Sequence, residues 1–405
     1  MSINLTFRGT RQISLSSLWR RPPQLDEALR ALQERYGYRI LEGGLLEFCP
    51  TGHVQVKATG GGIAGEFAGT PTGPGFHRAA VDFLTELGAL LGLRMTVDDD
   101  TGYWTHRDFD LLQAEYVNWL KGVMEFAVDP AQAENCLMLG WSVSSWHPTG
   151  ASGIATPTGL FAREVFRSKL EAGLVVQFAW RFFIWWDARR DALYFRGEAL
   201  FLLWNEVVWC EPRFDAEREL LTRVAGLLAK ARELDPELPL PVAAWAEVLG
   251  LLGRVPDAAT GPDLAEDGSI GYRRHEISVP LAAHWWVDLP GDAVEGEEEN
   301  AIYYWGQGWE FYCTVYRLGG GDIPQHIRVE GTEVVGERHG DTYHGAWKYC
   351  SEGEGPYWIL QGDVIGAEHR VVVTITWTEE SRTDWAKATF LGVRAGKDVG
   401  RARLR

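Results

Sequence analysis

The glycine-rich stretch at residues 60–65 (GGGIAG) matches the G-x-G-x-x-G pattern letter for letter. In a dinucleotide-binding fold this pattern opens a helix, and the N-terminus of that helix holds the pyrophosphate. The residues that follow, 66–71 (EFAGTP), cannot begin such a helix. We therefore expect a glycine-rich hairpin or flap at 60–65, and no cofactor.

A candidate nucleophile, Ser142, lies in the stretch 140–144 (GWSVS), which lacks the final glycine of the G-x-S-x-G elbow. His147 is too close in sequence to be the usual base, so Ser142 would need remote partners such as Asp187 or His275. A hydrolase centred on residues 141–147 is therefore an alternative interpretation. No residue is assigned a catalytic role, and whether the chain is an enzyme stays open.

Residues 106–108 (HRD) match the start of a kinase catalytic loop, but Gln113 stands where the metal-binding Asn belongs and no D-F-G follows. We expect only the beginning of a helix there. The three aspartates at 98–100 have only part of the calcium-loop spacing, which favours a solvated loop.

A histidine-containing region near residues 326–344 is a second candidate for metal-dependent chemistry. It lacks H-x-H or H-x-x-x-H spacing on a defined element, so surface histidines are the expectation and no metal site is assigned. The donors would be His326, His339, Asp341, His344 and His369.

An acidic run at 295–299 (EGEEE) predicts a mobile, solvated loop that could dock a basic partner surface. The candidate partner-binding residues are Asp288, Asp292, Glu295, Glu297, Glu298 and Glu299.

The overall charge agrees with such a partner. The formal net charge of −17 disfavours nucleic acid and anionic membrane, both of which require clustered positive charge, and it favours a basic protein. The five cysteines are far apart and include no C-x-x-C pair, so a reducing, cytoplasmic location is expected.

The most aromatic segment, residues 174–209, holds five of the 19 tryptophans. From Glu198 onward its apolar residues fall on every side of a helix, which predicts a buried helix. Charged residues interrupt every apolar window, so no membrane span is expected.

Periodicity and turn residues predict the other elements of the N-terminal half. Strands are expected at 3–8, 12–18, 38–48, 53–58, 93–97 and 136–143, and helices at 24–36, 74–91, 106–126 and 159–172, with turns over 146–157.

Two further helices, at 215–234 and 242–252, carry a family resemblance. Residues 231–236 (ARELDP), followed by Ala244-Trp245 and by 249–254 (LGLLGR), resemble the junction between consecutive tetratricopeptide units. The resemblance covers one hairpin, about residues 215–254. Helix pairs of that family form concave protein-binding surfaces, so the resemblance implies a protein partner.

Residues 256–271 are rich in Pro, Gly and acidic residues and predict a linker. Beyond it, strands are expected at 276–280, 285–289, 301–305, 309–317, 357–361 and 371–377, with 306–308 as a hairpin turn and Asp384 capping a last helix.

The sequence thus predicts an α+β fold. A mixed region (1–158) carries a helical region (159–255), and the linker (256–271) leads to a smaller antiparallel α+β domain (272–405). The favoured function is non-catalytic protein binding, as in a bacterial immunity or inhibitor protein that neutralises a basic partner. The alternatives are a hydrolase or metal-dependent enzyme, and glycan binding by C-terminal tryptophans. The candidates for stacking on sugars are Trp305, Trp309, Trp347 and Trp358.

Overall fold

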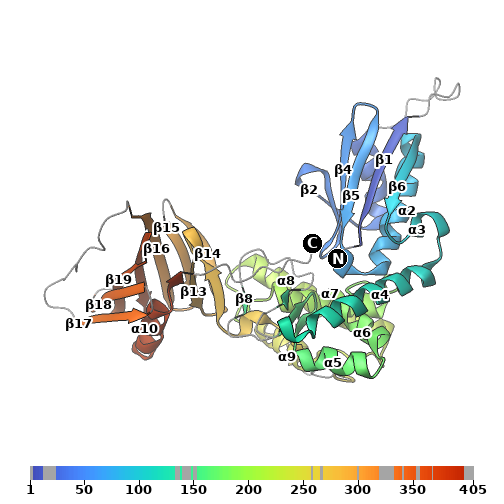
Figure 1. Cartoon of the computed structure of the whole chain (residues 1–405). Coiled ribbons are helices and arrows are strands. Elements are labelled where there is room, and N and C mark those ends of the chain that lie inside the picture. Colours follow the sequence, from blue (N-terminus) through green and yellow to red (C-terminus); the bar gives the residue numbers. More distant parts are fainter. Residues whose placement is uncertain are drawn as a thin grey trace.

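A computed structural model describes most of the chain and has the α+β architecture that the sequence predicts, with a separate β-rich C-terminal part (Figure 1). No helix in the described part of the chain is both long and apolar enough to cross a membrane. The described residues are 3–11, 24–132, 137–138, 147–148, 153–256, 259–264, 268–298, 301–318, 333–339, 342–352, 356–366 and 368–395.

The N-terminal part is a six-stranded antiparallel sheet in the order β2-β3-β4-β5-β1-β6. Helices α1 and α2 cover one face, and apolar residues of both layers share one core (Figure 1). Strands and helices alternate between buried and exposed positions as amphipathic elements should. The bounds are β1 Leu5–Arg11, α1 Leu25–Tyr36, β2 Arg39–Leu41, β3 Leu45–Cys49, β4 Gly52–Thr59, β5 Gly62–Ala68, α2 Pro74–Leu91 and β6 Leu93–Asp99.

The glycine-rich stretch supplies the turn between β4 and β5, at residues 60–61, and the first residues of β5, so the expected hairpin is confirmed. A Cβ added at Gly62 would lie 1.9 Å from the carbonyl oxygen of Gly9 in β1, which explains why glycine is needed there. The single strand expected at 38–48 is wrong, because Gly43 and Gly44 take positive φ and divide it into β2 and β3. The strand expected at 12–18 lies outside the described residues.

The middle of the chain is helical and centres on α7, in which every residue except Leu193 and Phe195 is buried. This confirms the buried helix that the aromatic segment predicts. The predicted helices at 215–234 and 242–252 are also confirmed, as α8 and α9, because both have uninterrupted helical periodicity. The bounds are α3 Tyr103–His106, α4 Phe109–Ala127, α5 Arg163–Glu171, α6 Val175–Phe182, α7 Ala192–Asn205, α8 Asp215–Leu234 and α9 Val242–Leu251.

Two expectations for residues 146–172 are wrong. The turn region contains strand β9 (Ile154–Thr156), and the helix expected from Gly159 begins at Arg163 because β10 (Gly159–Phe161) comes first. Strand β10 pairs with β9 and also with β11 (Gly268–Ser269), which is distant in sequence. Two short strands complete these sheets: β7 (Leu137–Met138), which comes before this region and pairs with β9, and β8 (His147–Pro148), which pairs with β12 (Ile277–Pro280).

The predicted linker makes local contacts in its described residues. The amide of Leu240 donates to Pro262 O at 3.0 Å, and the amide of Leu264 donates to Leu240 O at 2.8 Å. Residues 259–264 therefore lie against the helical region just before β11.

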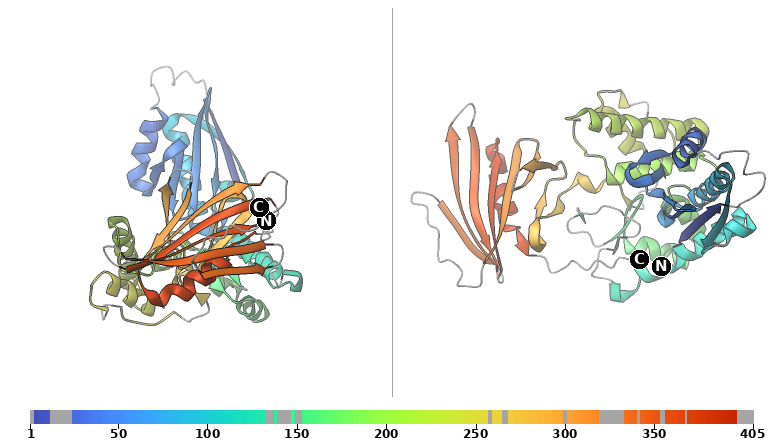
Figure 2. Two further views of the ribbon diagram at one scale, coloured as in Figure 1. Left: turned by 90° about the vertical axis from the view of Figure 1, so that its left-hand side faces the viewer. Right: turned by 90° about the horizontal axis from the view of Figure 1, so that it is seen from above.

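The C-terminal part contains a seven-stranded antiparallel sheet in the order β14-β15-β16-β20-β19-β18-β17, with α10 on one face (Figure 2). A smaller sheet in the order β21-β13-β12-β8 packs on the same core. The bounds are β12 Ile277–Pro280, β13 Trp285–Leu289, β14 Val294–Glu298, β15 Ala301–Gly306, β16 Trp309–Arg317, β17 Glu333–His339, β18 Thr342–Glu352, β19 Pro356–Ile365, β20 His369–Trp377, α10 Thr383–Leu391 and β21 Arg394–Ala395.

The acidic run is the most important correction in this part. Residues expected to form a mobile loop form β14, the strand at one end of the seven-stranded sheet. β17 and β18 were not predicted. Asp384 lies in the first turn of α10 rather than at its N-cap, which is Arg382.

Candidate interaction surface

Asp288, the first of the predicted partner-binding residues, is engaged within the C-terminal part. Its carboxylate forms an ion pair with Arg394, with 2.9 Å between Oδ1 and Nη2. It also accepts a hydrogen bond from the hydroxyl of Ser278, on the neighbouring strand β12. Asp288 therefore ties β13 to β12 and β21, and its charge is already compensated.

Asp292 is also engaged, and it organises the start of the acidic strand. Its Oδ2 accepts from the amide of Gln307 at 2.7 Å, and its Oδ1 accepts from Nε1 of Trp309 at 3.3 Å. These bonds hold the β15–β16 hairpin turn against the residue that leads into β14. Asp292 is thus a structural residue at one end of the predicted site.

Two arginines of other elements hold the backbone of residues 291–293, the segment that leads into β14. Arg213, just before α8, donates from Nη1 to the carbonyl of Asp292 at 2.9 Å. Arg273 donates from Nε to Gly291 O at 2.8 Å and also contacts Ala293 O. The beginning of β14 is therefore fixed to the helical region.

We expect Asp292→Ala to lower the free energy of unfolding by about 2 kcal/mol, because it leaves the Gln307 amide and the buried Trp309 indole without an acceptor. Urea denaturation followed by tryptophan fluorescence measures this. Asp263→Ala, which removes one hydrogen bond to the Val242 amide, is the control and should cost less. Equal losses would contradict the role given to Asp292.

β14 is an edge strand whose register with β15 places its residues on two faces. Glu295 pairs with Tyr304, which is buried, so Glu295 has the inner register, although at this edge its own side chain is exposed. Glu297 has the same register, and Gly296 and Glu298 have the outer one. The structure describes only the backbone of Glu297 and Glu298, and Glu299 lies outside the described residues.

A row of residues crosses the outer face of the sheet from this edge. Gly296 pairs with Tyr303, which pairs with Tyr312, which in turn pairs with Thr374. The rings of Tyr303 and Tyr312 stack, with centroids 4.3 Å apart and planes 19° apart. Both side chains are half-exposed, so the stack is accessible from solvent.

Glu310 lies beside this stack on the same face. Its Oε1 accepts from the Tyr303 hydroxyl at 3.5 Å, and its Oε2 accepts from the Thr376 hydroxyl at 3.2 Å. Burial, the Tyr312 hydroxyl and Glu310 together raise the pKa of Tyr303, so its phenol stays protonated and donates. The surface thus combines aromatic ring faces with a half-exposed carboxylate.

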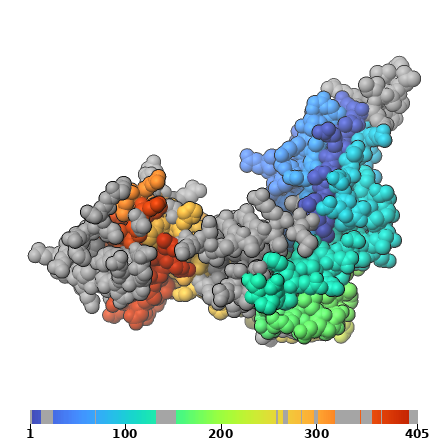
Figure 3. Space-filling view, viewed as in Figure 1, coloured from blue at the N-terminus to red at the C-terminus, as the bar shows by residue number. Residues whose placement is uncertain are grey.

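The sequence analysis missed Tyr303, Glu310 and Tyr312. It did predict the hairpin turn at 306–308, and that turn sets Tyr303 opposite Tyr312 in an antiparallel pair. The pairing of Tyr303 with Tyr312 could therefore have been found by counting residues outward from the predicted turn in both directions. In the space-filling view, the described residues of β15 and β16 are orange and lie at the end of the molecule away from the N-terminal sheet (Figure 3).

The sugar-stacking candidates do not share one exposed face. Trp309 is buried in the core, and Trp358 pairs with the buried Trp377, so both have the inner register. Trp305 contacts Phe214 of the helical region edge to face, at 5.5 Å between ring centroids. The side chain of Trp347 lies outside the described part. Two of the four candidates, Trp309 and Trp358, therefore do not lie on an exposed face of the sheet.

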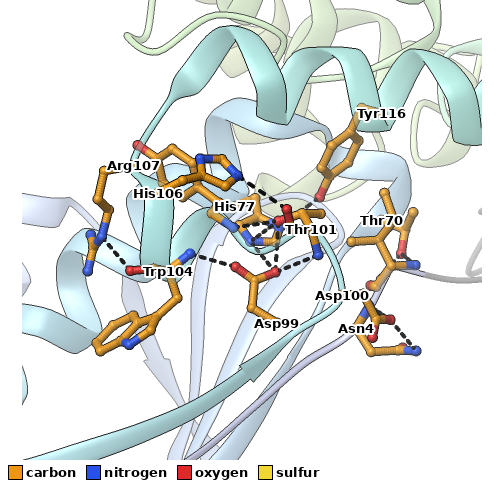
Figure 4. A network of polar contacts seen from close by, with 12 residues as sticks. Asn4, Thr70, His77, Asp99, Asp100, Thr101, Trp104, His106, Arg107 and Tyr116 are labelled. Carbon is orange, nitrogen blue, oxygen red and sulfur yellow. Dashed lines mark hydrogen bonds and ion pairs between the residues drawn. The ribbon is translucent and has the colours of Figure 1, made fainter.

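A second polar cluster joins α2 to the end of β6, and His77 is its centre (Figure 4). Nε2 of His77 is 3.2 Å from Oδ1 of Asp99, and Nδ1 is 3.3 Å from the Tyr116 hydroxyl. Asp99 also accepts from the Trp104 amide at 2.8 Å and from the Thr101 hydroxyl at 2.8 Å. The side chains of His77 and Asp99 are 0% and 2% exposed.

The electrostatics of Asp99 fit a structural role. Burial alone would raise the pKa of Asp99, but the hydrogen bond and charge of His77 and the bonds from Trp104 and Thr101 lower it to about 2. Both side chains find their partners inside the protein, and neither is open to a substrate. The solvated loop expected at 98–100 is therefore wrong for Asp99. Asp100 accepts from the backbone amide of Asn4 at 2.9 Å.

The other sequence candidates are not assembled into a reaction centre by the described residues. Asp108 caps α4, which confirms the predicted helix start. Asp187 and His275 are exposed, and Ser142 lies outside the described residues. Where the chain is described, no group of three His, Cys, Asp or Glu side chains could hold a metal ion. His339 and His344 belong to β17 and β18, and His326 and Asp341 are not described.

No protein-family model matches the chain, and no curated protein matches it. Among solved structures, a crystal structure from Bacteroides thetaiotaomicron VPI-5482 is similar over 29% of this chain and 47% of its own, at 11% identity and a TM-score of 0.23. The chain therefore spans about half of that protein's length. A likeness of this size supports no argument about fold or function.

Proposed function

We propose that the chain is a non-catalytic protein that acts by binding another protein, and that the partner adds a basic, extended segment to β14. The observation that carries the proposal is that the acidic run forms an edge strand. An edge strand presents unpaired backbone groups to a further strand. In this case four of the residues at 295–299 are glutamates, which favour a basic segment over an acidic or neutral one.

The immediate surroundings support this role. Asp292, Arg213 and Arg273 fix the beginning of the strand, so its backbone is held ready for pairing at little cost in ordering. A second copy of the chain is a poor occupant, because the net charge of −17 and the glutamates of two β14 strands would repel each other.

Neutralisation of a basic toxin or effector, as by a bacterial immunity protein, is the role that we favour within this class. The tetratricopeptide-like hairpin, now α8 and α9, is a second feature that favours protein binding. A cytoplasmic location is part of the proposal. It is supported by the wide spacing of the cysteines, of which Cys49, Cys210 and Cys313 are free.

The experiment uses a defined probe, a nine-residue peptide that alternates arginine with threonine or valine, and measures its affinity for the full chain by calorimetry. We expect binding that weakens as salt is raised. Neutralising the edge with Glu295→Gln, Glu297→Gln, Glu298→Gln and Glu299→Gln should lower the affinity about ten-fold, equivalent to about 1.4 kcal/mol.

The matched control removes the same number of charges elsewhere, at four exposed glutamates, and should leave the affinity within about two-fold, since distant charges are screened. A control variant that loses as much affinity as the edge variant would contradict a site at β14. Absence of binding to the unmodified chain would contradict the proposal itself. The control substitutions are Glu34→Gln, Glu115→Gln, Glu171→Gln and Glu237→Gln.

A further inference from the structure

Gly296 lets the ring of Tyr303 pack directly against the backbone of the edge strand on its outer face. A Cβ added at this residue would lie only 2.3 Å from Cδ1 of Tyr303, so the tyrosine ring occupies the space that a side chain would take. The residue beyond Tyr303 in the same row is Tyr312, and the two rings stack. An approaching strand would therefore meet an aromatic surface at this point, instead of a side chain of β14.

The register of an added strand brings its side chains to this surface. Successive side chains of a strand alternate between faces, and residues directly opposite each other have Cβ positions about 5 Å apart. A residue placed opposite Gly296 would thus project onto the outer face beside Tyr303. A long side chain from that position has the reach to cross Gly296 and contact the ring stack.

The chemistry of the surface selects a planar cation. Aromatic ring faces attract cations, and a guanidinium group also stacks on a ring and donates to a carboxylate in a fixed geometry. Glu310 provides that carboxylate beside the stack, held by the hydroxyls of Tyr303 and Thr376. A lysine ammonium would gain the charge interaction without the stacking.

We propose that Tyr303, Tyr312 and Glu310 form a subsite for one arginine side chain of the basic segment that β14 binds. The subsite rests on the proposed function, since the segment must first occupy the edge. The subsite narrows the class of partner from any basic surface to an extended segment that carries arginine on the face where Tyr303 packs against Gly296.

The test compares two nine-residue peptides that differ only in having arginine or lysine at the alternating basic positions. Calorimetry on the full chain should show the arginine peptide binding about five-fold more tightly. Tyr303→Ala should reduce this ratio to about one, while both peptides still bind through the edge. Gly296→Ala, which displaces the Tyr303 ring, should also lower the ratio, with circular dichroism confirming that each variant folds.

Tyr316→Ala is the matched control, because Tyr316 is 53% exposed and lies further along β16 with the same register as Tyr312. It should keep the five-fold ratio. A ratio near one in the unmodified chain, or a ratio that Tyr303→Ala leaves unchanged, would overturn the subsite and leave the proposed function standing. Failure of both peptides to bind would overturn the proposed function as well.

Sedimentation tests whether a second copy of the chain, instead of an arginine-containing segment, occupies the same surface. We expect the unmodified chain and Tyr303→Ala to sediment alike in the absence of peptide. A dimer that Tyr303→Ala dissociates would assign the surface to a second copy of the chain and would overturn the arginine subsite.

Discussion

Replacing Asp99 by alanine is expected to lower the free energy of unfolding by about 3–5 kcal/mol, because several buried or partly buried donors lose their acceptor together, at about 1–3 kcal/mol each. His77 would remain fully buried without its carboxylate acceptor. The amides of Thr101 and Trp104 would also lose theirs, so the start of α3 would lose its anchor. Urea denaturation of the full chain at neutral pH measures the change.

Asp99→Asn and a pH series separate charge from hydrogen bonding. The pKa of Asp99 is lowered from 3.8 to about 2 in the folded state, so its ionised form stabilises the fold above pH 4 and this contribution is lost as the pH falls through 2. The stability advantage of the unmodified chain over Asp99→Asn should therefore shrink by about 2 kcal/mol between pH 4 and pH 2. An advantage that does not change with pH would show that the charge is unimportant.

Trp204→Ala is expected to cost about 3–5 kcal/mol, as removal of a large aromatic side chain from a core usually does. Trp204 is on α7 but belongs to the core of the C-terminal part, where it contacts Tyr272 edge to face at 5.6 Å. Its loss should open a cavity between the helical and C-terminal parts. Denaturation and limited proteolysis should both report a weakened junction.

Trp180→Ala provides the comparison for Trp204→Ala, because Trp180 is a helical tryptophan that is 45% exposed. An exposed substitution of this kind normally changes stability by less than about 0.5 kcal/mol. If the two variants lose similar stability, the connection assigned to Trp204 is wrong.

The sequence predicted elements well where the signal was local. α8 and α9 have long helical periodicity and no competing pairing, and α7 is apolar on nearly every side, so their existence and burial followed from residue order alone. The hairpin at 306–308 was predicted for a similar reason, because a short glycine-containing turn joins two aromatic strands.

Elements that depend on distant partners were missed. β10 is three residues long and is stabilised by β9 and by β11, more than 100 residues away, which no local window contains. β14 was taken for a loop because its glutamates are typical of solvated segments. Glutamate is nevertheless tolerated in an edge strand, where half of the backbone faces solvent and a charge prevents aggregation.

The candidate site was predicted only in part. The sequence indicated the acidic stretch but could not show that Asp288 and Asp292 make intramolecular contacts, because their partners Arg394, Gln307 and Trp309 are remote or on a turn. The sequence also could not show that the candidate surface continues from β14 across β15 and β16. Placing Gly296, Tyr303 and Tyr312 in one row requires the register of all three strands.

Asp292 also constrains how the hairpin of β14 and β15 can change in length. Its carboxylate holds the Gln307 amide at the open end, and Gly296 must stay opposite Tyr303 to make room for the ring. Insertion or deletion of a single residue in one strand would move a glutamate to that position and exchange the two faces. Relatives that keep this ring arrangement should therefore gain or lose residues here only in matched pairs, one in each strand.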